Sequence, residues 1–364
     1  MSPRKRRIAL KRRSIQMRAA SFGPLLIAIL CLTRPLEAQE AAPCGPSAVA
    51  ASVTLEDGRL IRGLKAEHFS AWVQGKRVLI VSAATDLAPR RILLILDARQ
   101  TTKDVTWQVA TSLALQLVSQ ARPEDYFGLV TFGAEENSSL DFTARREETQ
   151  ERLSVLAKTR PRAARDDAGL FKALEEASEG FQKPQFGDSV LLFAVKPDYD
   201  QSQGVTRAKA VLLAKGIRLF MVTLRERSLT GRYVSATGMR ATASPAQGPV
   251  ALVPTVEFSR MDRERALDPD TVYLKNLVHD SGGMTMFENT DPEPGRYAAT
   301  DERMADLQRD LWRMYSNLAE LYRIQLDTPA SRDLLKLRLE ISKSVRQKFP
   351  LTGIFHAEQW IACP

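Results

Sequence analysis

The chain has 364 residues, enough for one large domain or one medium domain with additions, and 44% of them are hydrophobic, so a sizeable core can form. The formal net charge of +9 is unevenly distributed, because residues 1–38 contain nine lysines and arginines and a single acid, which leaves +1 on the remainder. A nearly neutral body gives no support to nucleic-acid binding.

The basic amino-terminal segment has the layout of an export signal. Basic residues extend to Arg18, the apolar stretch SFGPLLIAILCLT follows at 21–33, and the small residue Ala38 could precede a cleavage point. The apolar stretch is too short to span a bilayer comfortably. We therefore predict a signal peptide over residues 1–38 and an exported protein, periplasmic or extracellular. An uncleaved membrane anchor is the alternative, and residues 12–15 leave a twin-arginine signal open.

Cleavage would leave two cysteines, one at each end of the mature chain. Cys44 lies in a linker that we predict over residues 39–50, and Cys363 is the penultimate residue. An even number of cysteines in an oxidising compartment favours a disulfide. We predict a Cys44–Cys363 bond that ties the termini together, with two free thiols as the alternative.

Residues 51–88 predict a small antiparallel β unit. Apolar residues at 69, 72 and 73 are typical of an edge strand, residues 74–76 (QGK) of a hairpin turn, and residues 78–81 of the returning strand.

From residue 89 to residue 320, apolar strands alternate with longer segments of helical periodicity. Continuous apolar strands predict a sheet buried on both faces, and the alternation predicts a doubly wound, mostly parallel α/β sheet flanked by helices. Residues 225–266, rich in small and polar residues, are expected to form a long loop or an insertion. The strands are expected at 92–96, 126–132, 140–142, 189–195, 217–223 and 284–288, and the helices at 104–120, 148–157, 169–181, 205–215, 268–281 and 301–318.

The carboxyl-terminal segment, residues 321–364, returns to β character. Leucines and isoleucine alternate with polar residues over 335–341, and residues 355–361 close the chain. These strands are expected to pack with the amino-terminal β unit.

The order of these pieces resembles bacterial exported proteins with a von Willebrand factor type A-related domain. Six stretches between about residues 50 and 361 carry the resemblance, and their order is more specific than any one of them. They are DGRLIRGLKAEHFSAWVQGKRVLIVSA (57–83), RILLILDARQTTKD (91–104), DYFGLVTFG (125–133), AGLFKALEEA (168–177), LVHDSGGMTMFEN (277–289) and LAELYRIQLDTP (318–329).

The resemblance implies a metal-ion-dependent adhesion site, in which three loops supply oxygen ligands to a hard cation such as Mg²⁺. Asp97 matches the first aspartate and Thr101 a hydroxyl position, but Arg99, Ala168 and Val195 occupy the other ligand positions. A guanidinium keeps its charge and pairs with carboxylates. We therefore expect a degenerate site without metal, in which Asp97 pairs with Arg99 or with Lys196.

These observations predict a non-enzymatic, exported protein–protein interaction module that needs no cofactor. The three histidines lack metal-ligand spacing and are expected to be packing or surface residues. The alternative is a metal-dependent (Mg or Ca) adhesion protein with a remodelled site held by Asp97, Thr101 and Asp198. We expect no nucleic-acid partner and no membrane contact beyond the signal segment, while the protein partner and the oligomeric state stay unspecified. The predicted partner face comprises Asp97, Arg99, Thr101, Asp166, Asp167, Lys196 and Asp198.

Overall fold

The computed structural model describes residues 47–55, 58–99, 102, 104–135, 139–143, 145–164, 169–194, 202–225, 269–289, 300–328, 331, 333–350 and 353–361. The predicted signal peptide, both cysteines of the predicted disulfide and residues 226–266 of the predicted long loop lie outside them. Among the described helices, none combines the length and the apolar character needed to cross a membrane.

A six-stranded sheet forms the α/β part, in the order β6-β5-β4-β7-β8-β9. Five strands are parallel and β6 pairs antiparallel with β5 at one edge. Counted from β4, this is the doubly wound order 3-2-1-4-5-6, so the predicted fold class is confirmed. The strands are β4 (Arg91–Asp97), β5 (Tyr126–Phe132), β6 (Ser139–Thr143), β7 (Ser189–Ala194), β8 (Arg218–Arg225) and β9 (Thr285–Asn289).

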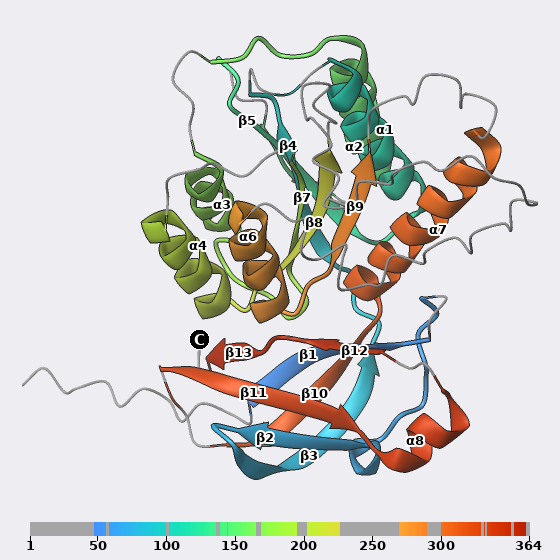
Figure 1. Cartoon of the computed structure of the whole chain (residues 1–364), viewed down its shortest axis with the longest axis vertical. Helices are drawn as coiled ribbons and strands as arrows, with labels where there is room; N and C mark the ends of the chain where they lie inside the picture. Colours follow the sequence, from blue (N-terminus) through green and yellow to red (C-terminus); the bar gives the residue numbers. More distant parts are fainter. Residues whose placement is uncertain are drawn as a thin grey trace, which may run out of the picture. The chain divides into compact units, whose positions relative to one another are not determined.

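Helices cover both faces of this sheet (Figure 1). Because successive side chains of a strand point to opposite faces, Leu94 and Leu96 of β4 pack with one group of helices and Leu93 and Ile95 with the other. The first group is α1 (Asp104–Gln120), α2 (Arg146–Lys158) and α7 (Thr300–Ala319), and the second is α3 (Leu170–Glu179), α4 (Ser202–Ala214) and α6 (Pro269–Asp280).

The amino- and carboxyl-terminal segments together build a separate antiparallel sheet, as predicted. Its order is β12-β1-β10-β3-β2-β11-β13, so β10 lies between β1 and β3. A 3-10 turn (Ala66–His68) precedes β2, and the short helix α8 (Lys343–Lys348) follows β11. The strands are β1 (Ser47–Thr54), β2 (Phe69–Val73), β3 (Lys76–Asp86), β10 (Leu321–Asp327), β11 (Leu334–Ile341), β12 (Gly353–His356) and β13 (Gln359–Ile361).

Two details of this sheet differ from the expectation. Strand β1 begins at Ser47, inside the predicted linker, because it pairs with β10 from that residue onward. Strand β2 is not an edge strand, since it pairs with β3 on one side and with β11 on the other. The pairings of β1 with β10 and of β2 with β11 join segments more than 250 residues apart in the sequence, which a local pattern does not reveal.

Residues 353–361 bring the two ends of the antiparallel sheet together. β12 pairs with β1, and after two intervening residues β13 pairs with β11. One continuous stretch of chain therefore bridges the first and last long strands, over a core that includes Phe69, Tyr322 and Trp360. The rings of Phe69 and Tyr322 meet edge to face with centroids 5.6 Å apart.

Two buried arginines bind backbone carbonyls at the end of α7. Arg90 donates from Nε to the carbonyl of Ala319 (3.0 Å), and Arg218 donates from Nη1 to the carbonyl of Asn317 (2.8 Å). These carbonyls belong to the last turn of α7. Carbonyl groups in this turn have no N–H donor within the helix, and they attract positive charge. Arg218 also donates to the carbonyl of Gly282 from Nε and Nη2, and burial lowers its pKa to about 9.

Candidate functional site

The carboxyl end of β4 lies in the middle of the six-stranded sheet. Asp97 is opposite Phe132 of β5, and its neighbour Leu96 is opposite Phe193 of β7. This position between two parallel neighbours is where doubly wound sheets place their binding sites. The strand that the sequence predicts therefore delivers its acidic residue to the expected edge.

Asp97 forms a closed ion pair with Arg99. Its Oδ1 accepts bonds from the Arg99 amide (3.2 Å) and Nε (2.9 Å), and its Oδ2 accepts one from Nη2 (2.7 Å). This fork geometry is the strong form of an arginine–carboxylate contact. Of the two pairings expected for Asp97, the one with Arg99 is present, and its guanidinium bonds both carboxylate oxygens.

The Asp97–Arg99 pair is buried. Asp97 and Arg99 are each only 3% exposed, and the guanidinium stacks over the Phe132 ring at 5.2 Å. In this conformation the charge of Arg99 is directed inward to Asp97. The place of Arg99 on the partner face stays a prediction.

Gly133 makes this packing possible. Its φ of +74° is a conformation that residues with a side chain rarely adopt. A Cβ atom at this position would lie 2.2 Å from Cγ of Arg99. The chain that leaves β5 can pass the Arg99 side chain only because residue 133 has none.

A further arginine, which the sequence analysis missed, holds the loop after β4. Arg160 donates from Nη2 to the carbonyl of Arg99 (2.7 Å) and from Nη1 to Asp104 at the start of α1 (2.9 Å). The strand pairing of Ala134 with Ala163 brings its loop here. In the sequence, the only indication of this contact was that the loop after α2 belongs to the same edge of the sheet as the carboxyl end of β4.

Other predicted site residues lie outside the described part of the chain. These are Thr101, Asp166, Asp167, Lys196 and Asp198, so the structure does not show whether they approach Asp97. Within the described residues, no group of three or more histidine, cysteine, aspartate or glutamate side chains could hold a metal ion. The hydroxyl of Thr102, which is buried, has no hydrogen-bond partner among the residues that the structure describes.

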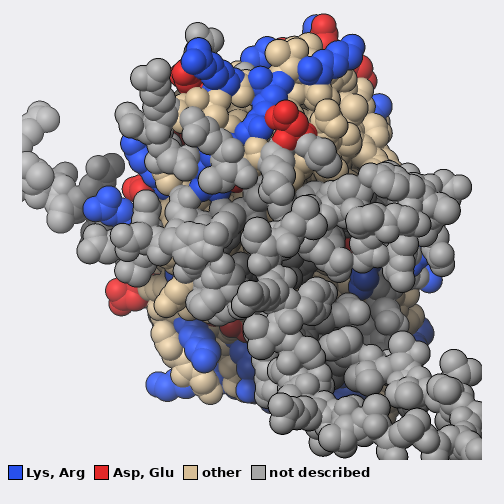
Figure 2. Space-filling model, turned by 45° about the horizontal axis from the view of Figure 1, so that its top comes forward, with Lys and Arg blue, Asp and Glu red and all other residues tan. Residues whose placement is uncertain are grey.

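Exposed charges near this edge are mixed in sign. Arg162 is mostly exposed and lies 3.4 Å from Glu135, and Arg160 pairs with Asp104. Figure 2, which turns the top of Figure 1 toward the viewer, shows lysine and arginine side chains interspersed with acidic ones over the described part of this face.

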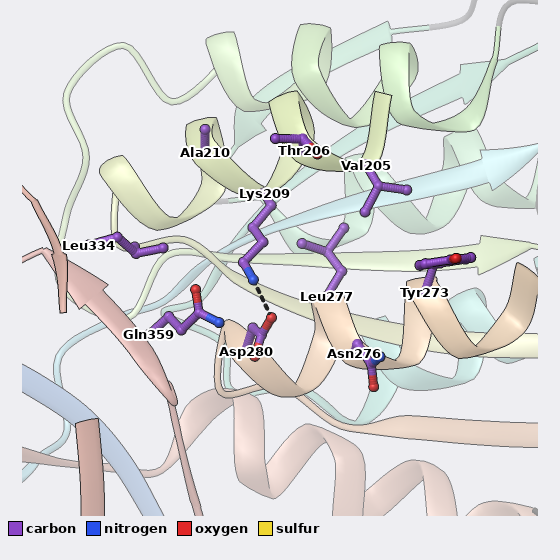
Figure 3. Close-up of a pocket in the computed structure, with 10 residues that line it drawn as sticks. All are labelled: Val205, Thr206, Lys209, Ala210, Tyr273, Asn276, Leu277, Asp280, Leu334 and Gln359. Atoms are coloured by element: carbon purple, nitrogen blue, oxygen red, sulfur yellow. Dashed lines mark hydrogen bonds and ion pairs between the residues drawn. The ribbon is translucent and has the colours of Figure 1, made fainter. Parts of the chain in front are cut away.

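A hollow of about 500 Å³ lies elsewhere, between α4, α6 and the ends of β11 and β13. Figure 3 shows Lys209 and Asp280 directed toward one another in it, and their charged atoms are 2.5 Å apart. Apolar side chains such as Val205 and Leu277 line the rest. None of the predicted site residues lines this hollow, and its one described ion pair is already satisfied.

No family model and no curated protein matches the chain. Similar solved structures include a conserved hypothetical protein, BatB, from Bacteroides thetaiotaomicron, with 15% identity over 60% of this chain and 98% of that one and a TM-score of 0.37. The Rpn10 von Willebrand A domain has 11% identity over 62% and 94%, with a TM-score of 0.38. A von Willebrand factor type A protein from Catenulispora acidiphila has 12% identity over 89% and 64%, with a TM-score of 0.40.

The second and third of these structures are described as von Willebrand A domain proteins. The strand order and register of this chain define its doubly wound fold without reference to them.

Proposed function

We propose that the chain is a non-enzymatic protein–protein interaction module that binds its partner without a metal ion. The observation that carries this proposal is the closed pair of Asp97 and Arg99. A metal-bridged contact needs carboxylate oxygens free to coordinate a cation. Here the guanidinium supplies the positive charge from within the protein.

The partner surface in this proposal consists of the loops that surround the pair. Arg162 is exposed and contributes a cation from the loop after α2, and Lys196 follows β7 in the sequence. Asp166, Asp167 and Asp198 lie in the same loops and add acidic groups. In this proposal Asp97 and Arg99 have a positioning role, because their pair holds the start of the loop after β4.

We further propose that the protein is exported through the amino-terminal signal segment. The support is the basic stretch followed by thirteen apolar or small residues at 21–33, together with cysteines only in that stretch and at the two ends of the mature chain.

Partner capture tests the proposed surface. The tagged chain would be expressed in its native cells, cross-linked, and purified with its partner. Replacing Arg162 and Lys196 by glutamate should reduce capture of the wild-type partner at least about tenfold, since reversing charges at an interface costs several kcal/mol. A matched control, Arg207→Glu with Arg346→Glu, reverses two exposed arginines on α4 and α8.

Equal capture by the wild type and by the first variant would contradict the proposed surface. Equal loss with both variants would show that any charge reversal disturbs binding and would contradict it as well. The alternative function, metal-dependent adhesion through Asp97, Thr101 and Asp198, predicts instead that a chelator abolishes capture by the wild type.

A further inference from the structure

The stretch that joins the two ends of the antiparallel sheet is fastened to β11 by a side chain. At Glu358 the backbone carbonyl still accepts the amide of Leu337 (2.8 Å). Two residues away, the chain has turned toward β1, and the amide of Leu339 donates to Nε2 of His356 (3.2 Å). The imidazole ring therefore takes the place of a strand carbonyl at the point where β12 and β11 separate.

This contact fixes the protonation state of the ring. A backbone amide can only donate, so Nε2 must be the unprotonated nitrogen. Nδ1 then carries the proton and donates it to the carbonyl of Ala357 (2.8 Å). A doubly protonated ring would have no acceptor left and would direct an N–H at the N–H of Leu339.

We propose that His356 is an acid-sensitive clasp: its protonation detaches residues 353–361 from β11 and loosens the junction between the antiparallel sheet and the α/β part. The clasp is built from one side chain and one amide on different strands. The closed and open states differ by a single proton on the ring. That proton replaces the hydrogen bond between Leu339 and Nε2 by a repulsive contact between two N–H groups.

The groups that surround the ring favour its neutral form. Burial is the main cause that lowers the pKa of His356, and the nearby His279 of α6 acts in the same direction, while the carbonyl of Ala357 and Glu358 oppose it. Glu358 lies 3.4 Å from His279. On β11, Arg338 and Glu340 pair with each other at 2.7 Å, and on β1 the opposite residue is Ala51.

The stretch between β12 and β13, which follows His356, contacts the α/β part directly. A Cβ atom on Gly282, in the turn after α6, would lie 2.4 Å from the amide nitrogen of Ala357. The carbonyl of the same glycine accepts two bonds from Arg218, which also holds the end of α7. Movement of the stretch between β12 and β13 is therefore transmitted through Gly282 to α6 and α7.

The direction of the pH effect follows from the lowered pKa. Between the folded-state pKa and the unfolded value of 6.5, the unfolded chain binds more protons than the folded chain. The stabilisation is complete above pH 6.5 and is lost as the pH falls through the folded-state pKa. The clasp is closed at neutral pH and opens in acid.

Amide hydrogen exchange of the full chain at pH 7.5, and at a lower pH at which nitrogen NMR shows the His356 ring protonated, tests the clasp after correction for intrinsic rates. Peptides that cover 334–341 and 353–361 should exchange roughly tenfold faster at the lower pH, the scale of one buried amide that loses its acceptor. In His356→Gln, which cannot be protonated, the corrected rates should be the same at both pH values. In His279→Gln the acid response should persist.

An unchanged acid response in His356→Gln, or no response in the wild type, would overturn the proposal. Should His356→Gln fail to fold, nitrogen NMR of the wild-type ring gives a direct answer. The proposal requires a proton on Nδ1 at neutral pH and a ring that titrates below 6.5. A proton on Nε2, or titration above that value, would contradict it.

Discussion

The carboxylate of Asp97 accepts bonds from both the amide and the guanidinium of Arg99, in a site from which solvent is nearly excluded. A buried ion pair adds little net stability when compared with apolar packing, but leaving one partner alone is costly. The pair is therefore best understood as a fixed arrangement that positions the loop after β4. Arg160 secures the same loop from the outside.

Replacing Gly133 by alanine should displace Arg99 from Asp97. The new Cβ would lie 2.2 Å from Cγ of Arg99, in addition to the strain of a positive φ. We expect the free energy of unfolding to fall by about 3 kcal/mol or more, which combines about 1–2 kcal/mol of backbone strain with partial loss of a buried pair. Urea denaturation followed by circular dichroism measures this change.

Gly75→Ala is the matched control for that substitution. Gly75 has a similar φ of +77°, but nothing lies within 4 Å of the position of its Cβ. It should therefore show the backbone strain alone, about 1–2 kcal/mol. Equal losses in the two variants would mean that the contact between Gly133 and Arg99 has no energetic importance.

At the scale of elements, the helices and strands of the α/β part could be predicted from the sequence. The spacing of their buried apolar residues follows a regular pattern over short stretches of chain. The continuous apolar run in RILLILD fills both faces of β4, and the helical spacing after it matches α1. Strand partners were less predictable. β2 has the local pattern of an edge strand, yet Trp72 lies between Arg77 of β3 and Arg338 of β11.

The candidate site could be predicted from the sequence only where it depends on residues that are neighbours in the chain. The pairing of Asp97 with Arg99 depends on two neighbouring residues at the end of one strand, so the sequence could indicate it. Its burial and the clamp by Arg160 depend on where another loop passes, which the pairing of Ala134 with Ala163 determines. Likewise, nothing near residue 356 indicates that its ring completes the ladder of β11.

For the whole molecule, the antiparallel sheet gathers the segments that lead to both cysteines. Ser47, three residues after Cys44, is opposite the end of β10, and Ile361, two residues before Cys363, is opposite the start of β11. A short connection joins β10 to β11, so both ends of the chain leave the sheet at the same end. This geometry supports the Cys44–Cys363 disulfide, which stays a prediction.

Intact mass of the mature protein under non-reducing conditions should be two hydrogen masses below that of the reduced chain. Reduction should then lower the free energy of unfolding by about 2–4 kcal/mol, because the unfolded chain gains freedom. A mass that corresponds to two free thiols would contradict the bond, and Cys44→Ser supplies the control in which reductant has no effect.

Metal binding by the carboxyl edge is the most direct test of the central claim that Arg99 replaces the cation. Calorimetric titration of the wild type with Mg²⁺, Mn²⁺ and Ca²⁺ should give no binding at micromolar concentrations. A variant with Arg99→Ser, Ala168→Thr and Val195→Asp returns the ligand types that the sequence resemblance implies, and it should acquire binding. Micromolar binding to the wild type that Asp97→Ala abolishes would contradict the account.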